Sequence, residues 1–186
     1  MQKIILASQS PRRKQLLEWA EVPFEIIIKE TDESYPDDLS IEEIPVHIAR
    51  NKALAVQKIT DISIPILAAD TVVVLGNRII GKPKDREDAI RILTDLSAQK
   101  HQVITGVVIR QANKEIAFAD KTEVKFHALE KEQIEFYIDK YKPYDKAGAY
   151  AIQEWIGVTG IQSINGDFYN VMGLPVSRVI KALKEF

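Results

Sequence analysis

The sequence predicts an α/β protein that folds as one domain over residues 1–186. Short apolar segments with strand character alternate along the chain with segments whose apolar residues recur at helical spacing. The composition, with 46% hydrophobic and 28% charged residues, is that of an ordinary globular domain that can build a sizeable core. The sequence contains no internal repeat, low-complexity tract or Gly/Ser-rich linker that would mark a second domain.

Charge and cysteine content exclude several classes of protein. The formal net charge of −2 argues against non-specific nucleic-acid binding, which normally needs a basic surplus. The absence of cysteine excludes disulfides, thiolate zinc sites and a cysteine nucleophile. The first apolar run is too short for a signal peptide, and no later segment is long enough to span a bilayer. We therefore expect a cytoplasmic protein without nucleic-acid or membrane partners.

The amino-terminal segment predicts a phosphate-binding loop. A strand over Lys3–Ala7 is followed by a helix in which Ser10 is the N-cap and Pro11 the first residue. Arg12 and Arg13 then fall in the first turn, where the helix dipole disfavours each cation by about 0.3–1 kcal/mol. A bound anion would gain both the free backbone N–H groups and the arginines. A solvent-exposed basic helix start is the alternative.

The next segments supply carboxylates and a lysine. A strand over residues 22–29 runs into an acidic cluster that ends at Glu33. Carboxylates at a strand end suit Mg²⁺ or Mn²⁺, although surface loops are also commonly acidic. A helix that starts at Ser40 or near Pro45 follows, and Lys52 lies at the border of its apolar face. Such a lysine can extend into solvent or reach into a cleft.

An apolar run over Ile66–Val74 carries a single carboxylate, Asp70, in its middle. A buried and unpaired aspartate costs several kcal/mol, so we expect a cation beside it. Gly76 and Asn77 predict a tight turn into a second strand that leads to Lys82. The alternative is a structural hairpin whose aspartate caps a turn.

The remaining elements are predicted from periodicity and turn residues. They are helices over 85–96, 130–141 and from Pro175, antiparallel strands over 101–110 and 116–126, and a hairpin turn over 164–169. Small residues in the segment 144–153 are typical of backbone that approaches a ligand. The three histidines lack metal-ligand spacing, and no Walker, dinucleotide-binding, kinase or Gly-x-Ser-x-Gly motif is present.

Several short stretches carry a combination that is more specific than any one of them. They are Ser8-Gln9-Ser10-Pro11-Arg12-Arg13, Glu33, Lys52, Ala69-Asp70-Thr71, Gly81-Lys82-Pro83 and the segment from Asp145 to Gln153. Together they resemble the Maf family of nucleoside triphosphate pyrophosphatases, from Leu6 to about Pro175. Gln153, with Arg12 and Thr71, resembles the branch that acts on dTTP and UTP. Ala151 is a small departure, since relatives more often carry glycine there.

The resemblance implies a Maf/inosine-triphosphatase-like fold, with a long twisted mixed sheet, flanking helices and a cleft between two lobes. It also implies that water attacks the α-phosphorus of dTTP or UTP, with a divalent cation such as Mg²⁺ or Mn²⁺, to give the monophosphate and pyrophosphate. Modified pyrimidine nucleotides are further candidate substrates, and a homodimer is compatible with the family.

The resemblance also assigns site residues. The substrate would be bound by Ser8, Ser10, Arg12, Arg13, Lys52, Thr71, Lys82 and Gln153. Glu33 and Asp70 would hold the metal, and the family makes Asp70 the proton acceptor. From the residues alone Asp70 is either a base or a metal ligand. Two alternatives remain: a 7-methyl-GTP pyrophosphatase with the same phosphate contacts, and a nucleotide-binding regulator of cell division without turnover, because Maf proteins are associated with septum inhibition.

Overall fold

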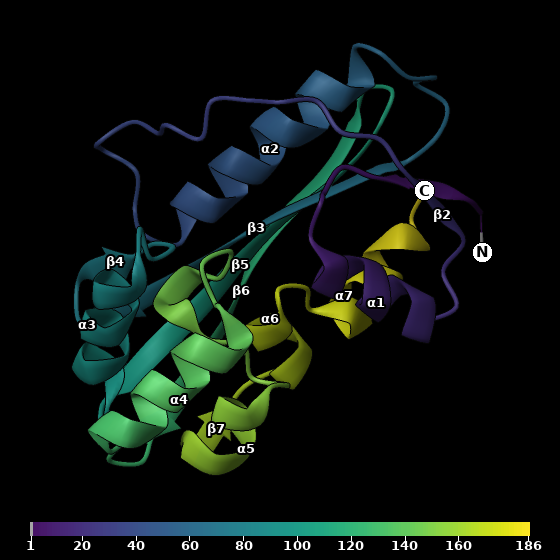
Figure 1. The fold of residues 1–186 in the computed structure, drawn as a ribbon. Coiled ribbons are helices and arrows are strands. Elements are labelled where there is room, and N and C mark those ends of the chain that lie inside the picture. The colour runs from purple at the N-terminus through teal and green to yellow at the C-terminus, as the bar shows by residue number, and fades with distance from the viewer. Residues whose placement is uncertain (1) are drawn as a thin grey trace. The chain divides into compact units, whose positions relative to one another are not determined.

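The computed structural model describes residues 2–186 and confirms the predicted mixture of strands and helices (Figure 1). The elements follow in the order β1 (Ile4–Leu6), α1 (Pro11–Trp19), β2 (Phe24–Ile26), α2 (Glu43–Gln57), β3 (Ile66–Leu75), β4 (Arg78–Ile80), α3 (Arg86–Leu96), β5 (Lys100–Gln111), β6 (Lys114–Phe126), α4 (Lys131–Tyr141), the 3-10 helix η1 (Ala147–Ala149), α5 (Trp155–Gly160), β7 (Ile161–Asn165), α6 (Phe168–Met172) and α7 (Val176–Leu183).

The strands form a mixed sheet, as predicted. Their order is β2-β1-β3-β5-β6-β7, and β4 pairs with β3 outside this path. β1 pairs in parallel with both β2 and β3, whereas β4 and β7 pair antiparallel with β3 and β6. Parallel neighbours need a crossover connection, and α1 provides it between β1 and β2. The tight turn at Gly76 and Asn77 is confirmed, because β3 and β4 pair up to Leu75 and Arg78.

The described residues divide into two compact units, and β3 passes from one to the other after Thr71. The first unit comprises the residues up to Thr71 together with Thr105–Asp120 and Gly173–Phe186. The second comprises Val72–Ile104 and Lys121–Met172. The expectation of a single domain stays a prediction.

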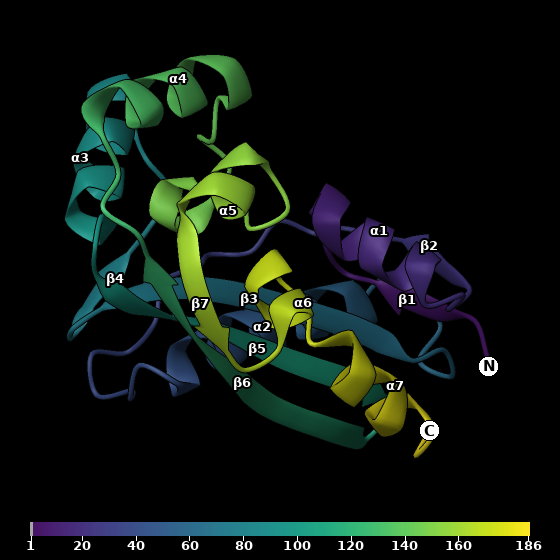
Figure 2. The ribbon, with the colours of Figure 1, turned by 90° about the horizontal axis from the view of Figure 1, so that it is seen from below.

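In the first unit, α2 covers one face of the strands. Its buried residues Ala49, Ala53 and Val56 pack with Ile66 and Val108 of β3 and β5. The first turn of α2 comes very close to β5, since a Cβ at Gly106 would lie 2.2 Å from the Val46 nitrogen. Figure 2 shows α1 and α7 on the other face of these strands.

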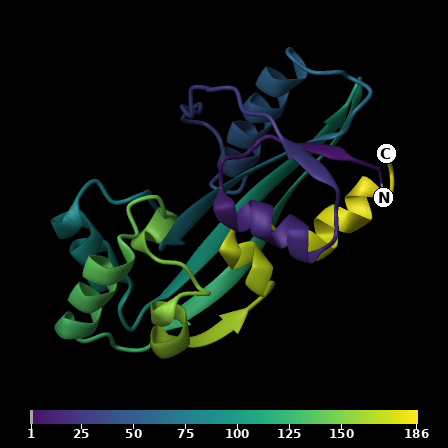
Figure 3. The same ribbon diagram turned by 45° about the vertical axis from the view of Figure 1, so that its right-hand side comes forward.

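In the second unit, α3 and α4 pack against each other, and η1 packs against α3 (Figure 3). The second unit also contains a buried aromatic cluster. In it, His101 of β5 stacks on Phe126 of β6, with ring centroids 5.4 Å apart. The edge of Tyr150 meets both rings. Across residues 2–186, no helix is both long and apolar enough to cross a membrane.

The predicted hairpin turn over residues 164–169 is wrong. β7 ends at Asn165 and the chain enters α6 instead of a returning strand. Asp167 explains this, because its Oδ1 accepts the Tyr169 N–H at 2.7 Å and so caps the first turn of α6. Gly166 has φ +132° and allows the tight passage beside Thr122, whose Oγ1 would lie 2.7 Å from a Cβ.

Two further boundaries differ from the predictions. The predicted strand over 22–29 is reduced to three residues in β2. α2 begins at Glu43, between the two predicted starts. Ser40 donates its N–H and hydroxyl to the Glu43 carboxylate, at 2.9 and 2.6 Å, so it fixes the turn that precedes the helix. α5 and α6 were not predicted, because helices of six and five residues carry too few turns for a periodic pattern.

Candidate functional site

Lys52, Glu33 and Asp70 meet in the first unit. The Lys52 ammonium lies 2.7 Å from Glu33 Oε1 and 2.8 Å from Asp70 Oδ1. Lys52 comes from α2, Asp70 from β3 and Glu33 from the segment after β2. The expectation of a cation beside Asp70 is therefore confirmed, and one ammonium group pairs with two predicted metal ligands.

The burial of these three side chains differs. Lys52 and Asp70 are 19% and 17% exposed, whereas Glu33 is 55% exposed. Asp70 follows the fully buried Ala68 and Ala69 on β3, so its carboxylate needs a partner. Lys52 precedes the fully buried Ala53, and its aliphatic stem can follow the apolar face of α2 while the ammonium reaches the carboxylates.

Arg13 is buried and connects three segments of the first unit. Its Nη1 donates to Ser8 Oγ at 3.1 Å, its Nη2 to Thr71 Oγ1 at 3.0 Å, and its Nε to the Gly173 carbonyl at 2.8 Å. Burial lowers the pKa of the Arg13 guanidinium, and the negative charge of Asp70 opposes that shift. Arg13 thus braces the start of α1 against Thr71, the residue after Asp70.

The predicted helix start is confirmed in detail. Ser10 caps α1, its hydroxyl accepts the Arg13 N–H at 3.4 Å, and Pro11 is the first helical residue. Ser8 accepts the Ser10 N–H at 3.2 Å, so the loop before α1 has a defined conformation. Arg12 is half-buried beside it. Whether this loop binds phosphate stays a prediction.

Two residues near Arg13 were missed by sequence reasoning. Thr105 of β5 is fully buried, and its hydroxyl lies 2.9 Å from Thr71 Oγ1. Thr105 is a hydroxyl-bearing residue in an otherwise apolar run over residues 103–109, but the run itself does not predict its partner. Gly173 accepts from Arg13 through its carbonyl and has φ +114°, a conformation that favours glycine. The Gly-Leu-Pro sequence before α7 is the signal that could have marked it.

Lys82 and Gln153 belong to the second unit. Lys82 is exposed, and the residue before it, Gly81, accepts the Gly148 N–H at 3.1 Å. The segment that leads to Gln153 is therefore attached to the loop that carries Lys82. Gly148 has φ +71° and approaches Val73, whose methyl group would lie 2.9 Å from a Cβ. The expected close backbone packing in this segment is confirmed.

The Gln153 side chain contains a buried acceptor. Within the described chain its Oε1 has no hydrogen-bond partner, although buried amide oxygens usually have one. Such an atom in a segment of small residues is a candidate contact for a ligand donor. The next residue, Glu154, accepts the Tyr137 hydroxyl and lies 3.6 Å from Lys146 Nζ, and the sequence analysis predicted neither contact.

Glu33 and Asp70 are the candidate metal ligands. Among residues 2–186 no group of three or more His, Cys, Asp or Glu side chains could hold a metal ion. Two carboxylates nevertheless suit Mg²⁺ or Mn²⁺, which usually take one or two of them and complete their coordination with water and phosphate oxygens. The donor set therefore fits a cation that is bound together with a phosphate ligand.

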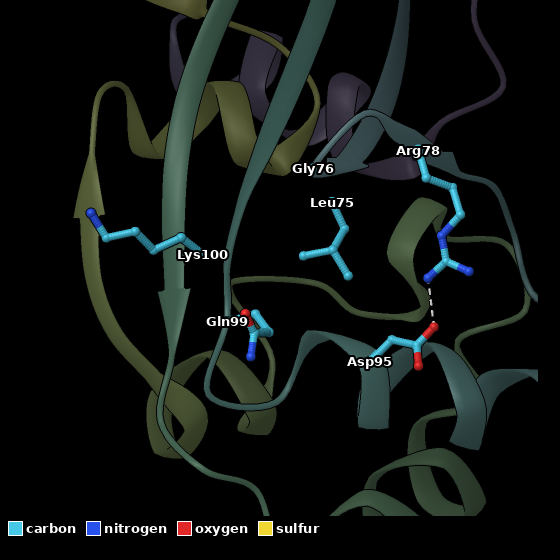
Figure 4. Close-up of a pocket in the computed structure, with 6 residues that line it drawn as sticks. All are labelled: Leu75, Gly76, Arg78, Asp95, Gln99 and Lys100. Atoms are coloured by element: carbon cyan, nitrogen blue, oxygen red, sulfur yellow. Dashed lines mark hydrogen bonds and ion pairs between the residues drawn. The ribbon is translucent and has the colours of Figure 1, made fainter.

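A surface depression of about 680 Å³ lies elsewhere in the second unit (Figure 4). Its lining residues are Leu75, Gly76, Arg78, Asp95, Gln99 and Lys100. Arg78 and Asp95 form an ion pair at 2.6 Å across it. The depression contains none of the predicted site residues, and nothing in its lining singles out a ligand.

The fold and the first unit define a mixed α/β protein with an arginine-braced helix start and carboxylates paired to lysine. Residues 3–186 match the Maf family, described as Maf-like protein. The chain belongs to this family.

Three proteins of similar sequence carry the same name. A "dTTP/UTP pyrophosphatase" of Parabacteroides distasonis is 49% identical over 99% of this chain and 96% of its own length. Those of Cytophaga hutchinsonii and Bacteroides fragilis are 51% and 46% identical, over 98% of this chain and 83% and 95% of their own lengths. The Staphylococcus aureus Ham1 structure is 15% identical, with a TM-score of 0.44 over 67% of this chain and 72% of that chain.

Proposed function

We propose that the protein hydrolyses dTTP and UTP to the nucleoside monophosphate and pyrophosphate. The observation that carries this proposal is the convergence of Glu33 and Asp70 on Lys52, at 2.7 and 2.8 Å, beside the arginine-braced start of α1. The proposal is supported by relatives 46–51% identical that are named dTTP/UTP pyrophosphatase. It treats residues 1–186 as one functional domain.

In the proposed reaction, water attacks the α-phosphorus. The new bond joins the water oxygen to this phosphorus, the bond to the bridging oxygen breaks, and pyrophosphate leaves with that oxygen. Asp70 accepts a proton from the attacking water and orients it. A divalent cation, Mg²⁺ or Mn²⁺, would be held by Glu33 and Asp70, and it would neutralise phosphate charge and make the water more acidic.

Lys52 has two tasks in this proposal. In the protein alone its ammonium neutralises the two carboxylates. When the triphosphate binds, the same ammonium turns to a phosphate oxygen and neutralises part of the phosphate charge. Electrostatic stabilisation of this kind is usually the largest contribution in phosphoryl transfer.

The triphosphate is assigned to the start of α1 and to Lys82. The N-terminal end of the helix dipole and Arg12 favour an anion. Lys82 is exposed and able to meet a phosphate group. Arg13 already makes three hydrogen bonds within the first unit, so its main task is to hold the loop and Thr71 in place.

The base is assigned to Gln153, with help from Arg12 and Thr71. Uracil and thymine present the N3–H donor beside a carbonyl acceptor, and a glutamine amide offers the matching acceptor and donor. The buried Oε1 of Gln153 lacks a donor within the described chain, and N3–H would supply one.

The proposal places the enzyme in the cytoplasm, without a nucleic-acid partner, and is compatible with a homodimer.

The test is a panel of nucleoside triphosphates with Mg²⁺ or Mn²⁺, scored separately for pyrophosphate and for phosphate. We expect pyrophosphate from dTTP and UTP. Preference for 7-methyl-GTP would reassign the substrate and leave the phosphate contacts intact. Binding of nucleotide without pyrophosphate release at saturating metal would contradict the proposal and favour a regulator of cell division.

A further inference from the structure

One buried hydroxyl forms hydrogen bonds to residues on both sides of Gln153 in the sequence. The hydroxyl of Tyr137, a fully buried residue of α4, accepts the Ala151 N–H at 3.1 Å. The same hydroxyl donates to the carboxylate of Glu154. These bonds reach the residue two positions before Gln153 and the residue directly after it. Both bonds lie within the second unit.

The Glu154 carboxylate is itself held in place. Lys146 Nζ lies 3.6 Å from Glu154 Oε1 and 2.8 Å from Asp145 Oδ1. The Lys146 side chain is only 9% exposed and that of Glu154 22%, so their charges are poorly solvated and need each other. Tyr137 is thus bonded to an acceptor that an ion pair already orients.

The backbone of the same segment has a third restraint. Gly157 of α5 packs directly onto Ile152, since a Cβ at Gly157 would lie 1.7 Å from the Ile152 carbonyl oxygen. No side chain other than that of glycine fits there without movement of the backbone. Residues 151–154 are therefore fixed at Ala151, Ile152 and Glu154, and the Gln153 side chain starts from a defined position.

A fixed position matters for an amide that distinguishes bases. A glutamine whose amide is turned by 180° presents a donor where it presented an acceptor, and it would then suit cytosine instead of uracil. Within residues 2–186 the buried Oε1 of Gln153 accepts no hydrogen bond, so no donor of the described chain holds this atom. The segment that carries Gln153 sets where its side chain starts, and therefore where its amide can meet a base.

We propose that Tyr137 is a positioning residue for base selection: its hydroxyl fixes residues 151–154 and thereby the place from which the Gln153 amide reaches the base. The inference rests on the proposed function, in which Gln153 reads a pyrimidine base. It adds a residue on α4 that does not itself contact the substrate.

The test is Tyr137→Phe, which keeps the ring and its stacking on Tyr141 at 5.0 Å and removes only the hydroxyl. We expect the ratio of kcat/KM for dTTP to that for CTP to fall about tenfold, mainly through KM for dTTP. Thr122→Val is the matched control. It removes another fully buried hydroxyl of the second unit, which donates to the Asp167 carbonyl at 3.0 Å, and should lower Tm without changing the ratio.

A second variant covers the case in which Tyr137→Phe does not fold. Glu154→Ala removes the acceptor of the Tyr137 hydroxyl and should lower the same ratio. Where Tyr137→Phe and Glu154→Ala both fold, they should act through the same hydrogen bond. The ratio in the double variant should then fall no further than in the more damaging single variant. Fully additive losses, or an unchanged ratio in Glu154→Ala, would contradict the inference.

Gln153→Glu in the same nucleotide panel separates failure of this inference from failure of the proposed function. If Gln153→Glu changes the nucleotide ranking and Tyr137→Phe lowers only Tm, Tyr137 has a purely structural role and the proposed function stands. If Gln153→Glu leaves the ranking unchanged, Gln153 does not read the base and both statements about base selection fall. Pyrophosphate release by the wild type tests the proposed reaction separately from both statements about base selection.

Discussion

Lys52 Nζ lies 2.8 Å from Asp70 Oδ1, and the same ammonium pairs with Glu33 at 2.7 Å. The Lys52 ammonium is therefore a cation that both carboxylates share. A divalent cation that uses both carboxylates has to compete with this ammonium for them. Metal binding and the position of Lys52 should consequently depend on each other, and the first two predictions test this relationship.

Asp70→Asn should abolish turnover while the protein stays folded. The substitution keeps the shape of the side chain but removes the charge that a metal or a reacting water needs. Lys52 retains Glu33 as its partner, so we expect Tm to hold or rise. Residual activity above about a tenth of wild type, a barrier change below ~1.4 kcal/mol, would show that Asp70 is not the catalytic carboxylate.

Lys52→Met should tighten nucleotide-free Mn²⁺ binding by about tenfold and lower turnover. It leaves two carboxylates without their ammonium partner, and a divalent cation then meets no competitor. Paramagnetic resonance of Mn²⁺ measures the affinity directly. Lys82→Met is the control, because the structure pairs Lys52, and not Lys82, with Glu33 and Asp70, so this variant should change turnover without changing nucleotide-free Mn²⁺ affinity. Equal affinities in wild type and Lys52→Met would contradict the competition.

Lys82→Ala and Arg13→Ala should separate binding from stability. Lys82 is exposed, so its removal should leave Tm nearly unchanged and weaken pyrophosphate binding by about 1.5–3 kcal/mol. Arg13→Ala should also lower the free energy of unfolding by about 2 kcal/mol or more, because three partners lose a buried donor. Calorimetry provides both Tm and pyrophosphate affinity. Equal losses for free nucleoside and pyrophosphate in Lys82→Ala would remove Lys82 from the phosphate contacts.

Gln153→Glu should impair hydrolysis of dTTP and UTP by about 1–3 kcal/mol and relatively favour guanine nucleotides. Guanine presents two adjacent donors, for which a carboxylate is the better partner. The measurement is kcat/KM on dTTP, UTP, CTP, GTP and 7-methyl-GTP. An unchanged ranking across the five nucleotides would leave the pyrimidine assignment resting on sequence similarity.

His101 should make stability depend on pH between about 6.5 and 4. Burial lowers the pKa of His101 to about 4 from its ordinary value of 6.5. The unfolded chain therefore binds more protons in this interval, and the free energy of unfolding falls as the pH falls through it, by at most about 3 kcal/mol. Denaturant titrations at several pH values measure this change. His101→Gln should lose this part of the dependence, whereas an identical dependence in the variant would assign it to carboxylates.

Local sequence signals determined the start of α1 and the turn after β3. Ser10 and Pro11 specify a helix start through capping and a fixed φ, and both effects act within a few residues. Gly76 has φ +60°, which glycine adopts without strain, so it places the turn between β3 and β4. The expectation of a cation near Asp70 was also correct, because an apolar strand imposes the same need for compensation wherever it lies in the fold.

Only the tertiary structure decided which cation meets Asp70 and what Arg13 does. Lys52 and Asp70 are 18 residues apart, and only the packing of α2 on β3 joins them. Arg13 and Gly173 are 160 residues apart, so their bond leaves no local pattern. The hydroxyl of Tyr137 reaches Ala151 in the same way, from a helix whose periodicity predicts burial but not a partner. Contacts between distant segments depend on how elements pack, and packing is a property of the whole chain rather than of any one segment.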